Sequence, residues 1–513
     1  MNMIIDKSPM NVILITLDDF SYELFVKNIE SLPFLRSLKS QSVSFEHAFS
    51  VGPTTFFAFP GIIAGVYPYH FGIGIPRGVK SIDEVLKDHG YNTAQINHAN
   101  VLLTPYFGYG IHIDNAKHVL NLPKGEFGSR IENTVFCRRG AEREKYDLFQ
   151  QYSPLMQRIL SKLRFIWTRS SFIRSCGKYC LSFLKFLRLY VGEEGRAGIS
   201  IKRQRNLYYQ FRDDVLEFIN REFEAPQFLW IHTIINHMPY IPVENCNKFS
   251  DKEVDSLNAR AISRFVNKES CARLKKLYVE SLKMTDTFVG DIFGALGTKG
   301  LLQNSIVVIT ADHGEEFMEE GYFGHDTTSS SDRLLHVPLL FFCPTLTQAR
   351  SISVPISTID ILPTICDLLG IDIPNTNRGI SIKTLVCENN SDVEKYNQRP
   401  LFSEAWVTRG LLDRSPGYTS SHRTFTVRQG IHKLKVDYLL TNDNRLAEKL
   451  ELMDWVNNRR LEVGKNRDIV DQLKQLLDNH LGDEEVFHSK IGISAEKQRI
   501  KRIADIIRNR NSQ

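Results

Sequence analysis

The chain has 513 residues, a formal net charge of +5, 42% hydrophobic residues and 24% charged residues. This length allows a large core and more than one structural unit, and the composition is ordinary for a soluble globular protein. The small net charge argues against nucleic-acid binding, which needs a concentrated basic face.

The eight cysteines are scattered, and the closest pair, Cys176 and Cys180, has no second pair at a zinc-site interval. We therefore expect free thiols in a reducing compartment. Residues 1–10 include Asp6 and Lys7 and no long apolar run, which is not the pattern of a signal peptide. No stretch reaches the roughly 18–20 apolar residues of a membrane-spanning helix. We expect a cytoplasmic location.

Short apolar runs alternate with helix-like segments through most of the chain. The first run, Asn11–Leu17, is followed by Asp18-Asp19 and is typical of a buried parallel strand. Later strand-like runs are Tyr91–Ile96, Phe228–His232, Ser305–Thr310 and Val337–Phe342, and the helix-like segments are Ser81–Gly90, Asn206–Arg221 and Leu274–Leu296. This alternation predicts an α/β domain with a mostly parallel sheet that helices cover on both faces.

The sequence changes in character from about Asn389. The segment Leu411–Thr441 mixes turns with strand-like pieces, and Arg459–Gln513 is highly charged and helical in period. We therefore predict a main domain over residues 1–388. A smaller C-terminal α+β region, residues 389–513, is expected to close against it and to end in an exposed tail.

A basic segment interrupts the main domain. Between Leu148 and Gly192 there is no acidic residue, and arginines and lysines alternate with large apolar side chains. A basic amphipathic helix can lie on an anionic membrane surface, so residues 158–190 are a candidate for peripheral membrane contact. The alternative is a helical insertion, about residues 148–205, whose cationic face is solvated or faces an anionic substrate.

Residues that suit metal binding stand at the predicted strand ends. Asp18 and Asp19 follow the first strand, and Asp312-His313 follow Ser305–Thr310. Ligands bind beyond the carboxyl ends of parallel strands, and hard cations need carboxylate oxygens. An adjacent Asp and His also suit a mixed oxygen and imidazole site, such as zinc or manganese. The pattern predicts a divalent metal site, with a capped turn and a structural Asp-His as the alternatives.

A hydroxyl-bearing segment, Gly52-Pro53-Thr54-Thr55, precedes the apolar stretch that ends in Gly65-Val66-Tyr67-Pro68. A hydroxyl near a helix start and against a metal ion can lose its proton and attack phosphorus or sulfur. Taken alone, the segment is a turn with a helix cap.

Together these pieces resemble the sulfatase family of the alkaline phosphatase superfamily. The shared features are the opening Asn-Val-Ile-Leu-Ile…Asp-Asp, a nucleophile ten residues before a Gly followed by Tyr-Pro, and a late Asp-His-Gly-Glu. The stretches His232–Tyr240 and Ser357–Thr364 also fit. The similarity covers about Asn11 to Ile371 and implies an alkaline-phosphatase-like fold and hydrolysis of a sulfate or phosphate ester.

The resemblance also implies roles for particular residues. Counting ten residues back from Gly65 makes Thr55 the nucleophile, with Thr54 as the alternative. One or two divalent ions (calcium, magnesium, manganese or zinc) are expected to bind Asp18, Asp19, Asp312 and His313.

Two histidines are candidates for the general acid. His237 resembles the histidine that protonates the leaving oxygen in this family. His325 stands where relatives carry a Lys or His that contacts the anionic ester or the leaving group. Imidazole titrates near neutral pH and suits this task. For both residues the alternative is an ordinary hydrogen-bonded histidine.

The segment after Thr55 departs from the family pattern. Typical sulfatases carry Cys or Ser at the nucleophile, which is oxidised to an aldehyde, followed by Pro, Ser and Arg. Here the next residues are Phe56–Phe59, and threonine cannot become that aldehyde. The missing arginine predicts an apolar rim beside the anion, and Pro60 predicts a helix that starts later or is kinked. A threonine nucleophile resembles the phosphoethanolamine-type transferases and phosphodiesterase-like relatives.

The sequence therefore predicts a metal-dependent enzyme that hydrolyses a sulfate or phosphate ester through Thr55. The expected partner is an anionic ester substrate, glycan-linked or lipid-linked, and not nucleic acid. Two alternatives are a transferase that modifies a glycan or lipid head group, and a catalytically inactive binding protein.

Overall fold

The computed structural model describes residues 10–69, 72, 74–75, 78–98, 100, 102–119, 200–223, 225–244, 246–345, 347–388, 393–408, 417–440 and 446–490. The insertion predicted at 148–205 lies outside the described residues apart from 200–205, and so does the membrane contact predicted for 158–190. Residues 389–392, at the predicted domain boundary, are also outside them.

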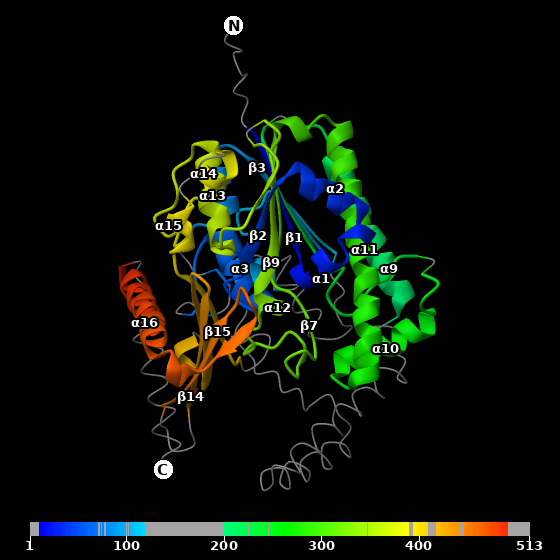
Figure 1. Ribbon diagram of the computed structural model, residues 1–513. Helices are drawn as coiled ribbons and strands as arrows, with labels where there is room; N and C mark the ends of the chain where they lie inside the picture. The colour runs from blue at the N-terminus through cyan, green and yellow to red at the C-terminus, as the bar shows by residue number, and fades with distance from the viewer. Residues whose placement is uncertain are drawn as a thin grey trace, which may run out of the picture.

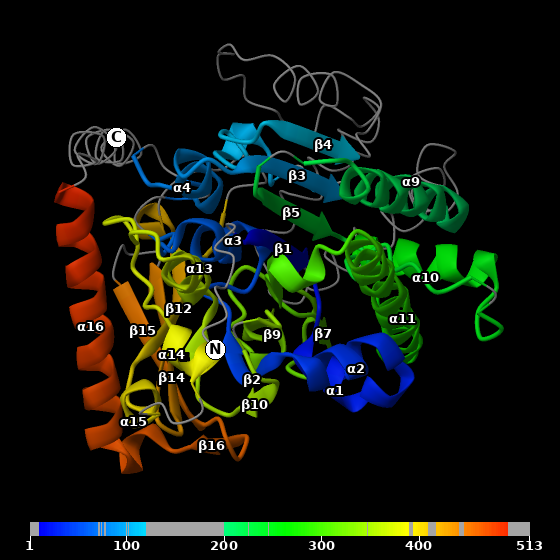
Figure 2. The ribbon, with the colours of Figure 1, turned by 90° about the horizontal axis from the view of Figure 1, so that it is seen from above.

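The main domain is built on a sheet in which nine strands are described (Figures 1 and 2). The strand order is β10-β2-β9-β6-β1-β5-β3-β4, and β11 also pairs with β2. The pairs that β9 makes with β2 and β6 are antiparallel, whereas the other pairs are parallel. The strands are β1 (Asn11–Leu17), β2 (Val43–Phe49), β3 (Asn92–His98), β4 (Asn115–Val119), β5 (Gln227–Thr233), β6 (Ser305–Ala311), β9 (His336–Phe342), β10 (Arg350–Ile352) and β11 (Ile356–Ser357).

Helices cover both faces of this sheet (Figure 2). One side carries α1 (Tyr22–Lys27), α2 (Pro33–Gln41), α9 (Ile201–Ile219), α10 (Asp251–Ser263) and α11 (Lys268–Thr298). The other side carries α3 (Thr55–Ala64), α4 (Ile82–Asp88), α13 (Ile361–Leu369) and α14 (Lys383–Cys387). Every residue of β1, β5 and β6 is buried between these layers, which explains their almost continuous apolar sequences.

The C-terminal region forms a second, five-stranded antiparallel sheet in the order β12-β13-β14-β15-β16. Its strands are β12 (Leu401–Trp406), β13 (His422–Gln429), β14 (His432–Leu440), β15 (Leu446–Asp454) and β16 (Arg459–Leu461), and α15 (Glu394–Asn397) precedes them. Helix α16 (Arg467–Lys490) packs on β13 and β14. Because Val470, Leu473 and Leu477 of α16 are buried in this contact, the prediction of an exposed tail is wrong for the part of the helix that carries these residues.

The predicted strands of the main domain are confirmed, and Asn11–Leu17 coincides with β1. The prediction that the helix after Thr55 starts later is wrong, because α3 begins at Thr55 and contains Pro60. The described cysteines, Cys246, Cys271, Cys343, Cys366 and Cys387, are free thiols. Among the helices that the structure describes, none combines the length and apolar character needed to span a membrane.

Candidate active site

The site is formed where β1 and β6 end. These strands pair in parallel with Leu17 opposite Ala311, so the residues that follow, Asp18 and Asp312, emerge side by side. The Asp18 amide donates a hydrogen bond to the Thr233 carbonyl at 2.9 Å. The sheet therefore fixes both carboxylates at its carboxyl edge, where ligands bind in open α/β folds.

The turn after β1 holds Asp19 in a left-handed conformation, with φ of 57°. The Tyr278 hydroxyl of α11 donates to the Asp19 carbonyl at 2.6 Å and accepts from the Ser21 amide at 2.8 Å. A non-glycine residue in this region costs about 1 kcal/mol or more and needs such support. Tyr278 thus fastens helix α11 to the turn that carries Asp19.

The four predicted metal ligands lie together and are at most 1% exposed. His313 Nδ1 lies 2.9 Å from Asp19 Oδ1, and His313 Nε2 lies 3.5 Å from Asp312 Oδ2 and 3.7 Å from Asp18 Oδ1. Among the described residues, Asp18 Oδ1, Asp19 Oδ2 and Asp312 Oδ2 have no hydrogen-bond partner, whereas Asp19 Oδ1 has the Nδ1 atoms of His313 and His325 at 2.9 and 3.0 Å. Buried carboxylate oxygens without partners are costly, and a divalent cation would satisfy them.

The pKa values in this cluster reflect the concentration of charge. Burial raises the pKa of Asp18, but a hydrogen bond from His232 helps to bring it below its ordinary value. Burial and the charge of Asp18 raise the pKa of Asp312 to about 6. Burial lowers the pKa of His313, but the charges of Asp312 and Asp19 bring it to about 9. Ionising all three carboxylates therefore requires nearby positive charge.

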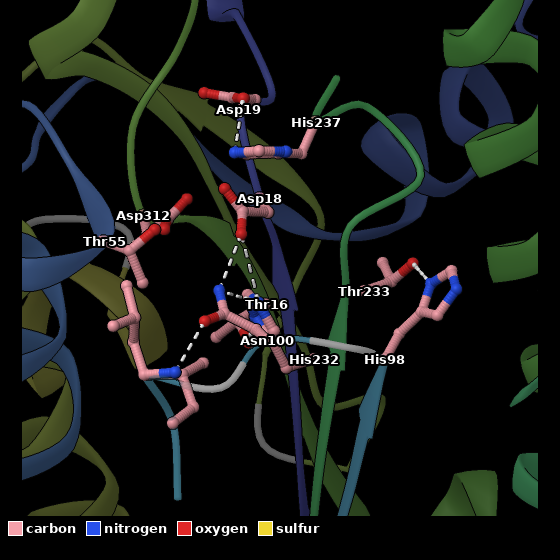
Figure 3. Close-up of polar contacts among 12 residues, drawn as sticks. Thr16, Asp18, Asp19, Thr55, His98, Asn100, His232, Thr233, His237 and Asp312 are labelled. Atoms are coloured by element: carbon pink, nitrogen blue, oxygen red, sulfur yellow. Dashed lines mark hydrogen bonds and ion pairs between the residues drawn. The ribbon is translucent and has the colours of Figure 1, made fainter. Parts of the chain in front are cut away.

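Thr55 lies at the start of α3, where its side chain contacts the cluster. Thr55 Oγ1 is 3.4 Å from His313 Nε2, and the residue is 6% exposed. In Figure 3 it lies beside Asp312. Thr54 precedes the helix in an extended conformation, and its buried Oγ1 has no hydrogen-bond partner among the described residues. The structure thus brings Thr55 against the predicted metal ligands.

The apolar residues after Thr55 belong to the core. Phe57, Ala58 and Phe59 have no exposed surface. The ring centroids of Phe57 and Trp406, a residue of the C-terminal sheet, are 4.4 Å apart, and those of Phe59 and His232 are 5.2 Å apart. The prediction of an apolar rim beside the anion is therefore wrong for these three residues, because they support α3 from inside.

The two general-acid candidates form the more open side of the cluster. The His237 side chain is 32% exposed, and its Nε2 lies 3.8 Å from Asp19 Oδ2. The His325 side chain is 17% exposed, and its Nδ1 lies 3.0 Å from Asp19 Oδ1 and 3.3 Å from Glu315 Oε1. Burial lowers the pKa of His325, but Asp19 and Glu315 bring it well above the ordinary value. Both histidines are near enough to Asp19 to act as metal ligands instead.

Two side chains that hold Asp18 have no role in the sequence prediction. The Asn100 side-chain amide donates to Asp18 Oδ2 at 2.9 Å, and His232 Nε2 lies 3.3 Å from the same oxygen (Figure 3). His98 is turned toward Thr233, and burial lowers its pKa to about 3. His232 was recognisable as a polar residue at a strand end and as the start of the stretch His232–Tyr240 that fits the family, but no role was predicted for it. Asn100 follows β3 without a distinguishing motif.

Comparison with known proteins finds a family match over most of the chain and relatives that are similar over part of it. A protein-family model described as Sulfatase matches residues 10–371. Arylsulfatase K of Bos taurus is 34% identical over 140 residues, which are 27% of this chain and 22% of that protein. Arylsulfatase K of Mus musculus is 29% identical over 190 residues, 36% of this chain and 29% of that protein. The chain thus matches less than a third of the length of these two relatives.

Solved structures of similar fold cover nearly all of the chain. A phosphonate monoester hydrolase from Silicibacter pomeroyi has a TM-score of 0.61 and 17% identity, covering 93% of this chain and 95% of its own. A protein in complex with its substrate D-glucosamine-2-N,6-O-disulfate has a TM-score of 0.59 and 12% identity, and the match covers 94% of this chain and 99% of that protein. Identities this low show the fold alone. The expected alkaline-phosphatase-like α/β fold with a smaller C-terminal α+β region is confirmed.

Proposed function

This chain belongs to the sulfatase family, and we propose that it hydrolyses sulfate or phosphate esters with Thr55 as the nucleophile and a divalent cation as cofactor. The observation that carries the proposal is the 3.4 Å contact between Thr55 Oγ1 and His313 Nε2, within a group of buried carboxylates of which three oxygens have no hydrogen-bond partner among the described residues. Relatives named as arylsulfatases and a phosphonate monoester hydrolase support an anionic ester substrate.

The residues fit a divalent cation because hard oxygen ligands and an imidazole converge in a buried site. The cation would be held by Asp18, Asp19, Asp312 and His313. When bound, it would favour the ionised form of the Thr55 hydroxyl and balance the negative charge of the ester. The position of Thr55 in the first turn of α3 also favours anions, because the amide groups at a helix start carry partial positive charge.

We propose a two-step reaction. The Thr55 hydroxyl gives its proton to solvent water and Oγ1 attacks sulfur or phosphorus, so that a bond to Oγ1 forms while the bond from sulfur or phosphorus to the leaving oxygen breaks. A histidine gives its proton to the leaving oxygen. Water then attacks the sulfur or phosphorus of the threonine ester and gives a proton to the same histidine. The bond to Thr55 Oγ1 breaks, sulfate or phosphate leaves, and Oγ1 regains a proton from solvent.

His325 is better supported than His237 as this acid. Its Nδ1 faces Asp19 and Glu315, which leaves Nε2 for the substrate. His237 places Nδ1 2.7 Å from the Met238 carbonyl and is more exposed. Replacing the histidine that acts as the acid with Asn should slow the hydrolysis of esters with poor leaving groups far more than that of activated 4-nitrophenyl esters. Only the poor leaving groups need a proton on the leaving oxygen.

The first test is an activity screen of metal-loaded protein on aryl sulfate, phosphate monoester, phosphodiester and phosphonate esters. Thr55→Ala should abolish turnover of the active ester class, and Asp312→Asn should do the same while lowering the metal content. Thr54→Ala is the matched control, because it removes the neighbouring hydroxyl. Retention of activity by Thr55→Ala, or loss only in Thr54→Ala, would reject Thr55 as the nucleophile.

A second measurement detects the covalent step directly. Wild-type protein quenched during turnover should carry one added sulfuryl or phosphoryl group on the peptide that contains Thr55, identified by mass spectrometry. If product forms only when a sugar or lipid hydroxyl is added, the transferase alternative is favoured. If the wild type shows no activity with any metal or ester and binds no metal, the interpretation as an inactive family member is favoured.

A further inference from the structure

The described site is accessible mainly on the side of His237 and His325. These side chains are 32% and 17% exposed, whereas the four predicted metal ligands are at most 1% exposed. A substrate whose ester group contacts Thr55 must therefore extend its remaining part past this side. Residues that border this side of the site can contact the part of the substrate that does not react and so determine specificity.

An arginine lies at this border. Arg264, the residue after α10, is exposed, and its Nη1 donates a hydrogen bond to the carbonyl of Phe323, two residues before His325. A Cβ atom on Gly324 would overlap the Arg264 guanidinium, so the two segments are in direct contact. Arg264 thus presents its charge next to the residue that precedes His325.

Arg264 forms no ion pair with a described carboxylate, although Glu315 is near enough that the charge of Arg264 partly offsets the rise in the Glu315 pKa caused by burial. Arg273 pairs with Glu253 and Lys275 pairs with Glu319, but no described carboxylate lies within ion-pair distance of Arg264. Asp326, which follows His325, accepts hydrogen bonds from the amide and hydroxyl of Thr328 in its own turn. One contact to a carbonyl leaves most of the five guanidinium donors available.

The backbone makes an arginine at this position unusual. Arg264 has φ of 57°, the left-handed conformation in which a helix commonly ends with glycine. The chain therefore carries a long cationic side chain where the backbone favours a residue without a Cβ atom.

We propose that Arg264 is a specificity-determining residue that binds a second anionic group on the non-reacting part of the substrate. The preferred substrates are thus esters with at least two negative charges, such as a second sulfate, a phosphate or a carboxylate. Arginine suits this role because its planar fork matches the two oxygens of such groups. The proposal rests on the proposed ester hydrolysis at Thr55.

The test compares a plain 4-nitrophenyl ester of the active class with the same ester carrying a ring carboxylate. We expect Arg264→Met to raise KM for the carboxylated ester about tenfold relative to the plain ester, the effect of losing one charge-assisted contact. Arg264→Lys should raise this KM ratio less than Arg264→Met does, because lysine keeps the positive charge. Lys268→Met, which removes an exposed cation four residues along the chain, is the control and should leave the KM ratio unchanged. Added salt should reduce the wild-type preference.

If Arg264→Met changes KM equally for both esters, Arg264 only holds the segment before His325. If it changes KM for neither ester, Arg264 does not contact the substrate. Either result overturns the inference while ester hydrolysis stands. Calorimetric titration of metal-loaded protein with benzenesulfonate and benzene-1,3-disulfonate tests binding without turnover. Loss of the preference for the disulfonate in Arg264→Met supports the inference, and an unchanged preference rejects it. A wild type that turns over neither ester counts against the proposed function alone.

Discussion

Replacing Asp332 by Asn should destabilise the contact between the C-terminal sheet and the main domain. Asp332 lies in α12 (Asp332–Leu335), directly after the loop that begins with His325. It forms ion pairs with Arg428 of β13 and with Lys433 of β14, whose Nζ lies 2.6 Å from Asp332 Oδ1. The substitution keeps the shape and one acceptor oxygen but leaves two neighbouring cations without an anion.

The magnitude follows from the exposure of the three side chains. Arg428 and Lys433 are 3% and 7% exposed, so neither can regain its hydration. Breaking a buried pair by removing one partner costs about 3–5 kcal/mol. Asp332 is itself 36% exposed, so solvent screens part of the interaction. We therefore expect a loss of about 2 kcal/mol, below the fully buried range.

The effect should depend on pH in a defined direction. Burial raises the pKa of Asp332, but Arg428 and Lys433 bring it well below its usual range. A folded-state pKa below the unfolded value of about 3.9 gives stability that is present above that pH and is lost as the pH falls. The difference between wild type and Asp332→Asn should thus be constant between about pH 5 and 8 and should shrink below about pH 4.

The assay is urea denaturation of wild type, Asp332→Asn, Lys433→Met and the double variant, followed by circular dichroism. The double variant should lose less stability than the sum of the single variants, because removing Lys433 also removes one of the unpaired cations. Additive losses, or a loss below about 0.5 kcal/mol in Asp332→Asn, would refute this account of the contact.

Three further predictions concern the site and its surroundings. Tyr278→Phe removes the hydroxyl that bonds Asp19 and Ser21, so it should cost about 1–3 kcal/mol and weaken metal binding measured by calorimetry. Chelation by EDTA should lower the melting temperature of the wild type, because a cation bound to the native state stabilises it. The melting temperature of Asp312→Asn should not change, because this variant has lost a metal ligand and holds no cation for EDTA to remove. Burial raises the pKa of Glu316 to about 7, so its stabilisation is present below about pH 4.5 and lost as the pH rises toward 7. Glu316→Gln should therefore be more stable by about 2 kcal/mol at pH 8, a gain that thermal melts should show vanishing below pH 4.5.

The central strands could be predicted because burial on both faces selects uninterrupted apolar sequences. β1, β5 and β6 are recognisable for this reason. β2 escaped prediction because Glu46 and His47 interrupt its apolar residues. The pairing register shifts between Phe45 and Ala48, so these two polar residues lie at a bulge and are only partly buried. Local sequence carries no signal for such a bulge.

The site could be predicted only where motifs mark strand ends. Asp18 and Asp312 follow apolar strands directly, and their convergence follows from parallel pairing. Asn100 and His232 reach the same carboxylate from 132 residues apart in the chain, and only the strand order β1-β5-β3 brings them together. The roles of Thr55 and His313 as nucleophile and ligand stay predictions that the proposed variants test.

The C-terminal sheet contributes to the placement of the nucleophile. Phe57, two residues after Thr55, packs against Trp406 of β12 and belongs to the core formed with the sheet and α16. The Glu404 carboxylate of β12 accepts a hydrogen bond from the Tyr69 amide at 3.0 Å, after the end of α3. Helix α3 is therefore held at both ends by the strand that opens the C-terminal region.

The same sheet also holds the loop of His325. Lys433 donates to the Ser330 carbonyl at 2.5 Å and pairs with Asp332, which closes that loop. The two segments that carry Thr55 and His325 come from opposite ends of the main domain sequence, and both are fastened to the C-terminal sheet. A sub-ångström shift of that sheet would change the distance between nucleophile and acid, to which catalytic rates are sensitive. The Asp332→Asn variant should consequently lower kcat more than KM, a split that a contact serving stability alone would not produce.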